Sequence, residues 1–305
     1  MTIMEAIRWG NEKLKDHIDL IGHKKQRIDS SMLDAEILLA QALEVQKTWL
    51  FSNLNQPLLE NQKAKFESLI KRRLSHEPIA YIAGHKDFYK RRFKVTPDVL
   101  IPRPATETLI EAALHVGELN DPELTLFADI GTGSGAIAVT LAAESNIPVL
   151  ATDLSNQALD IAKHNATKHN VADKIDFRPG DTLEPLINIF KKISTSAYPV
   201  KHLILCANLP YLTDYQLDTA QDEVRQYEPH LALGAGHDGL DLYWKLFRQL
   251  IRNRTILPKH VTTLIEIDPS QNERIITLIR HDFHQANPKV IKDLEGHDRI
   301  VISKI

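Results

Sequence analysis

The chain has 305 residues, of which 43% are hydrophobic and 25% are charged, and its formal net charge is −3. The composition is that of an ordinary globular protein, and the length favours two domains. The slight negative charge excludes a general attraction to nucleic acid or to an anionic membrane, although it allows a local basic patch. A single cysteine, Cys206, excludes an internal disulfide and a CxxC metal site, and it is typical of a reducing cytoplasm, where we expect the protein to act.

The sequence contains no recognisable membrane-spanning segment. No apolar run approaches the roughly 20 residues that cross a bilayer. Charged residues are interspersed through residues 1–20, so we expect no signal peptide there. The sequence therefore predicts no membrane partner.

Residues 1–85 predict a small helical domain. Ser30 and Ser31 are suited to cap its second helix, and Pro57 and Pro78 bound its third. Apolar residues recur at helical spacing along three stretches: Ile3, Ile7, Leu14 and Ile18; Leu33, Ile37, Leu38 and Leu43; Phe66, Leu69, Ile70 and Leu74. Because no polar side chains converge there, we expect a bundle without chemistry of its own that grips a macromolecular substrate.

Residues 86–98 predict a β-hairpin linker, since aromatic and basic residues alternate along this stretch. We expect Lys90, Arg91 and Arg92 to lie at its turn. Two interpretations are open for these cations. They form a solvated basic turn, or they contact an acidic partner or RNA phosphate.

A strand, a glycine turn and a helix follow one another early in residues 99–305, which is the arrangement of a nucleotide-binding site. The buried strand covers residues 124–130 and the apolar helix residues 136–143. The turn between them consists of Gly131, Thr132, Gly133, Ser134 and Gly135. Its G-x-G-x-G spacing differs from that of dinucleotide sites, and no Gly-Lys-Ser/Thr follows, which argues against a phosphate-binding P-loop.

Two acidic residues extend the predicted cofactor site. Asp153 ends a second strand 22 positions after Gly131, where a carboxylate can accept hydrogen bonds from both ribose hydroxyls. Asp181 lies in a third segment, residues 175–182, and is suited to accept the adenine amino group, although an Asp after a Gly is also common in turns. Since no Lys or Arg accompanies the loop, the pattern favours S-adenosylmethionine, which has no phosphates, over NAD.

The tetrad Asn208-Leu209-Pro210-Tyr211 follows an apolar strand at residues 202–205 and predicts the catalytic site. A planar nitrogen with a delocalised lone pair is a poor nucleophile, so its N–H groups must be held while it meets an electrophile. The side-chain oxygen of Asn208 and the carbonyl of Leu209 can each accept one hydrogen. Pro210 fixes the direction of that carbonyl, and the Tyr211 ring can cover the flat face of the substrate.

An ordinary Asn-Pro turn is the alternative for this tetrad. The glycine loop upstream favours the catalytic interpretation, because it fits a cofactor that carries the electrophile. We expect direct methyl transfer with no metal, no covalent intermediate and no strong general base, with catalysis arising mainly from orientation. The 14 histidines show no metal-binding spacing.

Longer motifs carry a closer resemblance. They are Glu77–Gly84, Phe93–Pro104, Asp129–Gly135, Asn208–Tyr211, Glu223–Leu233, Asp238–Tyr243 and Leu294–Arg299. Through them the chain resembles the bacterial release-factor glutamine N5-methyltransferases, the PrmC/HemK family, nearly from end to end. The Ile-Pro-Arg-Pro motif and the Glu-Val-Arg and Asp-Gly-Leu series are more specific to this family than the glycine loop.

The resemblance implies an α/β fold with a helical substrate-recognition domain (1–85), a β-hairpin linker (86–98) and a Rossmann-like, seven-stranded, S-adenosylmethionine-dependent methyltransferase domain (99–305). It implies an enzyme that methylates the glutamine amide in the Gly-Gly-Gln motif of peptide chain release factors. The cofactor contacts are then Gly131–Gly135 and Asp153, with Thr182 beside the adenine and Asn208 at the reacting end, and Asn208–Tyr211 form the glutamine pocket. We expect a monomer that needs no nucleic acid.

Three positions depart from the usual family pattern. Leu209 stands where the family has Pro, Ala105 where it commonly has Glu, and Asp268 where Gly is usual. The role we assign to residue 209 belongs to its carbonyl, which Leu retains, so we expect activity to survive. The other two positions bear on the fit of the substrate.

Alternative functions share the same chemistry. An adenine amino group poses the same geometric problem as an amide, and Asn-Leu-Pro-Tyr is the form familiar from ribosomal RNA adenine dimethylases. An N6-adenine methyltransferase acting on ribosomal RNA or DNA is therefore one alternative, which the net acidity argues against. A glutamine methyltransferase of a ribosomal protein is another, and a catalytically idle binding module is a third.

Overall fold

The computed structural model describes residues 1–15, 30–193 and 200–305. They form two compact units. The first unit consists of Met1–His85 together with Gln221–Tyr227, and the second of Lys86–Ala220 together with Glu228–Ile305. The chain thus leaves the second unit after the tetrad, contributes seven residues to the first, and returns.

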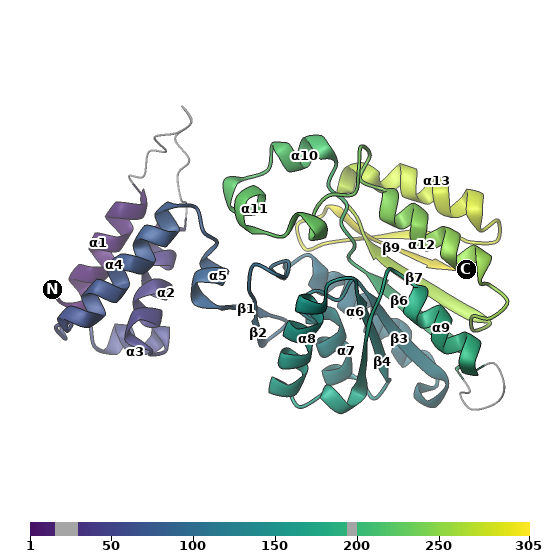
Figure 1. Ribbon diagram of the computed structural model, residues 1–305, viewed down its shortest axis with the longest axis horizontal. Coiled ribbons are helices and arrows are strands. Elements are labelled where there is room, and N and C mark those ends of the chain that lie inside the picture. The colour runs from purple at the N-terminus through teal and green to yellow at the C-terminus, as the bar shows by residue number, and fades with distance from the viewer. Residues whose placement is uncertain (16–29, 194–199) are drawn as a thin grey trace. The chain divides into compact units, whose positions relative to one another are not determined.

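The first unit is helical, as the apolar spacing predicted (Figure 1). Leu14, Leu38 and Phe66 are fully buried in its core. Its helices are α1 (Ile3–Lys15), α2 (Ser31–Leu43), α3 (Lys47–Ser52), α4 (Glu60–Leu74), α5 (Ile79–Ala83) and α11 (Asp222–Tyr227). The predicted Ile18 lies outside the described residues.

Two details of α2 differ from the prediction. Leu33 is 45% exposed, because α2 turns Ala35, Leu38 and Leu39 toward the core instead. The Ser30 side chain makes no capping hydrogen bond, and the hydroxyl of Ser31 donates to Asn11 Oδ1 of α1 over 2.8 Å. The serines therefore mark the start of the helix without capping it in the expected way.

The predicted hairpin is present and consists of two strands, β1 (His85–Phe88) and β2 (Arg91–Lys94). Its turn is shorter than predicted, since Tyr89 and Lys90 have φ of 45° and 61° and form it alone. Our assignment of Arg91 and Arg92 to the turn is wrong, because both lie in β2. Arg91 pairs with Glu144 at 2.5 Å and Arg92 with Asp87 at 3.0 Å, so each cation already has a carboxylate partner.

The second unit is built on a seven-stranded sheet in the order β5-β4-β3-β6-β7-β9-β8. The first five strands of this order are parallel, and β9 is antiparallel to both neighbours. The strands are β3 (Thr125–Ile130), β4 (Val149–Asp153), β5 (Ile175–Pro179), β6 (His202–Ala207), β7 (His260–Glu266), β8 (Lys289–Lys292) and β9 (Asp298–Lys304). The strand order reverses between β3 and β6, which is where open α/β sheets bind ligands.

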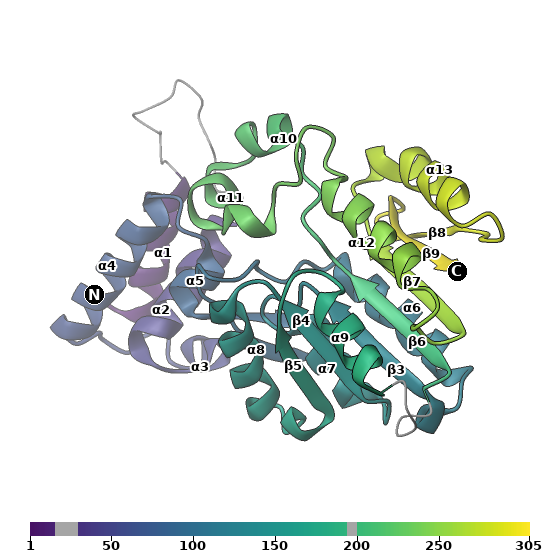
Figure 2. The same ribbon diagram turned by 45° about the vertical axis from the view of Figure 1, so that its right-hand side comes forward.

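Helices cover both faces of this sheet (Figures 1 and 2). One face packs against α6 (Thr106–Glu118), α7 (Ala136–Glu144) and α8 (Asn156–Lys168), and the other against α9 (Glu184–Ile193), α12 (Asp241–Arg252) and α13 (Asn272–Asp282). Shorter helices are α10 (Asp214–Asp218), η1 (Pro122–Leu124), η2 (Ala172–Lys174), η3 (His230–Ala232) and η4 (Pro269–Gln271). The predicted Rossmann-like α/β fold is confirmed.

Candidate active site

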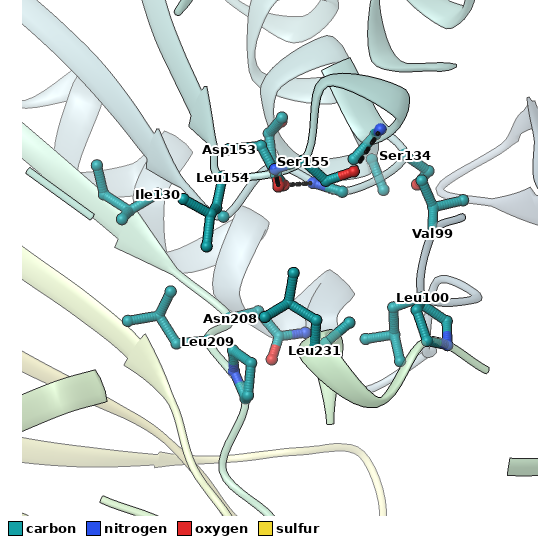
Figure 3. A pocket seen from close by; sticks show the side chains of 18 of the residues that line it. Val99, Leu100, Ile130, Ser134, Asp153, Leu154, Ser155, Asn208, Leu209 and Leu231 are labelled. Atoms are coloured by element: carbon teal, nitrogen blue, oxygen red, sulfur yellow. Dashed lines mark hydrogen bonds between the residues drawn. The ribbon is translucent and has the colours of Figure 1, made fainter. Parts of the chain in front are cut away.

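A cavity of about 390 Å³ opens in the second unit at the carboxyl ends of β3, β4 and β6 (Figure 3). Asp153 and Asn208 lie on opposite sides of it. The predicted site residues that line it are Gly131, Thr132, Gly133, Ser134, Asp153, Asp181, Thr182, Asn208, Leu209 and Pro210. Gly135 and Tyr211 are not among the lining residues. The fold therefore brings together the glycine loop, both acids and most of the tetrad.

The glycine loop turns tightly under the cavity. The N–H groups of Gly131 and Thr132 both donate to Thr152 O over 2.9 Å, which ties the loop to the end of β4. Gly133 has φ +55° and open space where a Cβ would stand, as a close approach to a ligand requires. Gly135 has a different role, because a Cβ there would lie 3.0 Å from Ala162 Cβ of α8. It allows helix packing, the task of the last glycine in such loops.

Asp129 anchors this loop from below. It is fully buried, and its Oδ2 accepts hydrogen bonds from the Thr132 hydroxyl at 2.6 Å and from the Ala138 N–H at 3.1 Å. Burial raises the pKa of Asp129 to about 7. Sequence reasoning did not single out this carboxyl group, although it precedes the first glycine by only two residues.

Asp153 closes the cavity on the opposite side from the tetrad. Its Oδ2 accepts the Gly133 N–H at 2.8 Å and its Oδ1 accepts the Ser155 N–H at 2.9 Å. Burial raises the pKa of this carboxyl group. The Leu154 N–H also acts on this carboxylate, which has about four acceptor sites, so it can still accept a ligand hydroxyl. The neighbouring Leu154 is 57% exposed and adds an apolar surface to the cavity wall.

The loop carrying Asp181 and Thr182 is held by α12. Asp181 forms an ion pair with Lys245. The side-chain oxygen of Gln249 accepts hydrogen bonds from the Thr182 hydroxyl at 2.7 Å and from the Leu183 N–H at 2.9 Å. Lys245 and Gln249 stand four residues apart on one face of α12, more than 60 residues from the loop, and no local signal indicated their role. The adenine contact of Asp181 stays a prediction.

The tetrad is fixed by long-range contacts. Asn208 Nδ2 donates to Thr106 Oγ1 over 3.1 Å, and the Tyr211 hydroxyl donates to Glu266 Oε1 over 3.4 Å. The Leu209 side chain is buried and lies against Gly131. The predicted stacking of Tyr211 on a substrate stays a prediction, since the structure accounts for its hydroxyl only. Burial raises the pKa of Tyr211 above its ordinary value of 10.0.

The Asp-Gly-Leu motif supports the tetrad from the side. Gln271 Nε2 donates to Tyr211 O at 2.8 Å, to Gly239 O at 3.2 Å and to Asp238 O at 3.4 Å. Sequence reasoning missed Gln271, which lies 60 residues beyond Tyr211. It joins the motif to the turn that carries the predicted chemistry.

One cation does line the cavity. Arg103 forms an ion pair with Glu228, whose side chain is 1% exposed and whose Oε2 also accepts the Ile101 N–H at 3.2 Å. The charge of Arg103 is thus partly neutralised by the Glu228 carboxylate.

The single cysteine, Cys206, is buried in β6, and burial raises the pKa of its thiol well above the ordinary value. In the described parts of the chain no group of three His, Cys, Asp or Glu residues is arranged to hold a metal ion.

Comparison with known proteins matches both halves of the chain. The family model of the PrmC N-terminal domain matches residues 5–84, and that of a methyltransferase domain matches residues 127–227. Release factor glutamine methyltransferases of Bacillus anthracis and Staphylococcus aureus are 32% and 34% identical to the chain. The first alignment covers 100% of both chains, and the second 95% of this chain and 98% of its relative.

The chain belongs to the release factor glutamine methyltransferase family. It is therefore a methyltransferase that uses S-adenosylmethionine, and the resemblance, the enzyme class and the cofactor predicted above are confirmed. Among solved structures, the hMettl16 catalytic domain in complex with MAT2A 3′UTR hairpin 6 has a TM-score of 0.51 at 15% identity, covering 69% of this chain and 74% of that one. This likeness concerns the fold alone.

The cavity suits the cofactor of this family. The open space over Gly133 suits a close approach of the ligand to the loop. The carboxylate of Asp153 suits a ribose, and the apolar surface of Leu154 suits a flat base. A volume of about 390 Å³ is in the range of small-molecule sites.

Within the described residues, no helix is both long and apolar enough to cross a membrane.

Proposed function

We propose that this enzyme transfers a methyl group from S-adenosylmethionine to the side-chain amide nitrogen of the glutamine in the Gly-Gly-Gln motif of peptide chain release factors. The observation that carries the proposal is the position of Asn208, at the end of β6 across the cavity from Asp153. There it holds an acceptor for an amide N–H at the far end of the cofactor cavity. Full-length similarity to release factor glutamine methyltransferases supports the same substrate.

The methyltransferase unit divides the work between two sides of its cavity. When bound, the cofactor supplies a methyl group on a positively charged sulfur. The glycine loop and Asp153 bind its nucleoside end, and Thr182 lies at the edge of the same cavity. Leu154 and Leu231, both more than half exposed, add apolar walls that exclude water when a substrate fills the site.

The tetrad orients the nucleophile. The Asn208 oxygen accepts one N–H of the substrate amide and the Leu209 carbonyl accepts the other, so that the nitrogen lone pair points along the cavity. As positive charge builds on that nitrogen, both acceptors bind its protons more strongly, which lowers the barrier. A methylated amide that carries positive charge loses its proton readily, so the site needs no strong base.

All the described residues that line the cavity belong to the second unit, and none belongs to the helical unit. We propose that residues 1–85 recognise the body of the release factor. Residues 86–98 then serve as the linker and residues 99–305 as the methyltransferase domain. Gln221–Tyr227 form an exception in this division, because they pack with the helical unit.

The test compares the wild type with Asn208→Ala on a purified release factor. Loss of the amide acceptor should lower kcat by about a hundredfold or more, while the affinity for S-adenosylmethionine changes only a few-fold. The control is Asn120→Ala, which removes an amide at the end of α6 whose Nδ2 donates to Val116 O. Near-wild-type turnover of Asn208→Ala would contradict the assigned role.

A further inference from the structure

Asn208 does not stand alone at the end of β6. In the parallel register Ala207 of β6 lies beside Ile265 of β7, so Asn208 and Glu266 follow at the same level on neighbouring strands. Thr106, the first residue of α6, bridges them. These three residues come from three separate elements of the chain. Asn208 and Thr106 line the cavity, whereas Glu266 does not.

The bridge has a defined direction. The Thr106 hydroxyl donates to Glu266 Oε2 over 2.7 Å and accepts from Asn208 Nδ2 over 3.1 Å. Thr106 is 4% exposed and Glu266 is 1% exposed, so neither gains a substitute partner easily from solvent. A hydroxyl has one proton to give, and an ionised carboxylate can only accept. Burial raises the pKa of Glu266 to about 7, so above this pH the carboxylate is ionised and the proton of Thr106 is committed to it.

The remaining partners of Glu266 reinforce this direction. The Tyr211 hydroxyl donates to its other oxygen, Oε1, over 3.4 Å. The Tyr243 hydroxyl of α12 donates to its backbone carbonyl, which fixes the end of β7. Both carboxylate oxygens therefore receive a hydroxyl proton, and the lone pair of Thr106 is left facing Asn208.

We propose that Thr106 and Glu266 are positioning residues that fix which end of the Asn208 carboxamide faces the substrate, and that they thereby select a carboxamide over a carboxylate. The inference rests on the proposed function. With Nδ2 bound to Thr106, the Asn208 oxygen faces the cavity. A flipped Asn208 would set two oxygens against each other and leave a buried hydroxyl lone pair without a donor.

The selectivity follows from the acceptors that remain. The oxygen of Asn208 and the carbonyl of Leu209 attract the two N–H groups of a glutamine amide. The same pair repels the oxygens of a glutamate side chain, which has no proton to donate at neutral pH. A site built to bind a hydrogen-bonding group rejects the analogue that lacks it far more strongly than an apolar pocket does.

The test uses Thr106→Val, which keeps the shape and removes the hydroxyl, and Thr106→Ser, which restores it. Methyl transfer to a release factor is measured at pH 8, with cofactor affinity and the melting temperature recorded for each variant. A release factor with glutamate in the Gly-Gly-Gln motif serves as a competitor. We expect Thr106→Val to lose about tenfold to a hundredfold in kcat, and Thr106→Ser to recover most of it.

The competitor separates positioning from general damage. Thr106→Val should be inhibited by the glutamate competitor at least several-fold more strongly than the wild type, because its Asn208 can turn Nδ2 toward the substrate. Equal kcat and equal inhibition in Thr106→Val and the wild type would overturn the inference. A loss of kcat with unchanged discrimination, not repaired by Thr106→Ser, would also overturn it. Absence of transfer by the wild type would instead overturn the proposed function.

Discussion

Gln271 holds the tetrad through its side-chain amide, whose Nε2 atom lies 2.8 Å from the backbone oxygen of Tyr211. The same amide donates to Gly239 O and Asp238 O, and the Gln271 side chain is almost completely buried. The two protons of this amide are thus shared among three carbonyls of two loops that meet at the active site. This contact gives the Asp-Gly-Leu motif a structural purpose next to the reacting residues.

Replacing Gln271 tests that purpose. Gln271→Ala should lower kcat for release factor methylation by about tenfold, since the turn after Asn208 loses its lateral support and the carbonyls of Tyr211 and Gly239 lose a donor. Cofactor affinity should stay within a few-fold, because Gln271 does not line the cavity. The matched control is Gln285→Ala, on an exposed residue. Unchanged kcat in both variants would show that the tetrad needs no such support.

Gly239 leads to a second prediction. It has φ +71°, and an added Cβ would collide with the Tyr211 carbonyl and with Gln271 Nε2. Gly239→Ala must therefore displace the turn that carries the tetrad, and we expect a loss of turnover larger than that of Gln271→Ala. Gly296→Ala is the control, because Gly296 has φ +85° with open space around its Cβ position. It bears the same backbone strain of roughly 1 kcal/mol without the collision.

Comparing the kinetics of Gly239→Ala and Gly296→Ala separates the effect of the Cβ collision from that of the backbone strain. Both variants should lose a similar amount of stability through the backbone, and only Gly239→Ala should lose kcat. A Gly296→Ala variant as inactive as Gly239→Ala would mean that general destabilisation explains the effect.

Arg73 gives a prediction for the helical unit. Its guanidinium, 4% exposed, donates to Asp34 over 2.7 Å and to Glu223 over 2.6 Å. Glu223 belongs to the segment 221–227, so this ion pair fastens that segment within the first unit. Glu223→Gln should cost about 1 to 2 kcal/mol of unfolding free energy, because Arg73 keeps Asp34 and Glu223 is 33% exposed.

The measurement is chemical denaturation together with limited proteolysis of residues 221–227. The segment should be cut faster in Glu223→Gln than in the wild type, whereas Glu118→Gln, on the exposed end of α6, should leave both readings unchanged. Equal proteolysis of the wild type and Glu223→Gln would contradict an anchoring role for Arg73.

Glu266 leads to a prediction about pH. Burial raises its pKa from 4.5 to about 7, while the charged and hydroxyl groups that face it act in the opposite direction. Those groups are Thr106 of α6, Arg299 of β9, Tyr211 of the tetrad and Arg103 before α6. A carboxyl group whose pKa is higher in the folded state stabilises the fold below its unfolded pKa. That contribution is lost as pH rises toward the folded pKa.

The wild type should therefore lose stability relative to Glu266→Gln between pH 4.5 and 7, by about 3 kcal/mol in total. Above pH 7 the difference should be constant. Asp129 titrates in the same range, but it is present in both proteins and cancels. Denaturant unfolding at pH 5, 6, 7 and 8 gives the slope. A difference that does not vary with pH would contradict a raised pKa of Glu266.

The sequence allowed prediction of those parts of the site that are local in the chain. The glycine loop, Asp153 and Asn208 each follow a strand, and parallel strands bring their carboxyl ends together, so their convergence in one cavity follows from the pattern. The hairpin was predicted as an element, but its turn was placed too late. The contact from Tyr89 N–H to Glu107 Oε1, which supports the turn at residues 89–90, joins positions 18 residues apart.

The supporting residues were not predictable in this way. Thr106 lies 102 residues from Asn208 and 160 residues from Glu266, and each is an unremarkable residue in its own segment. Lys245 and Gln249 sit on an amphipathic helix whose polar face reads as solvent-exposed until the fold brings the Asp181 loop against it. Such pairings depend on tertiary packing, for which one sequence carries no local signal.

The most direct test of the proposed function is the location of the transferred methyl group. Purified enzyme and labelled S-adenosylmethionine are offered a release factor and ribosomal RNA in parallel, and mass spectrometry locates the label. We predict label on the side-chain nitrogen of the Gly-Gly-Gln glutamine, which would also show that Leu209 is tolerated in the tetrad. Label on RNA adenine and none on the release factor would contradict the proposal.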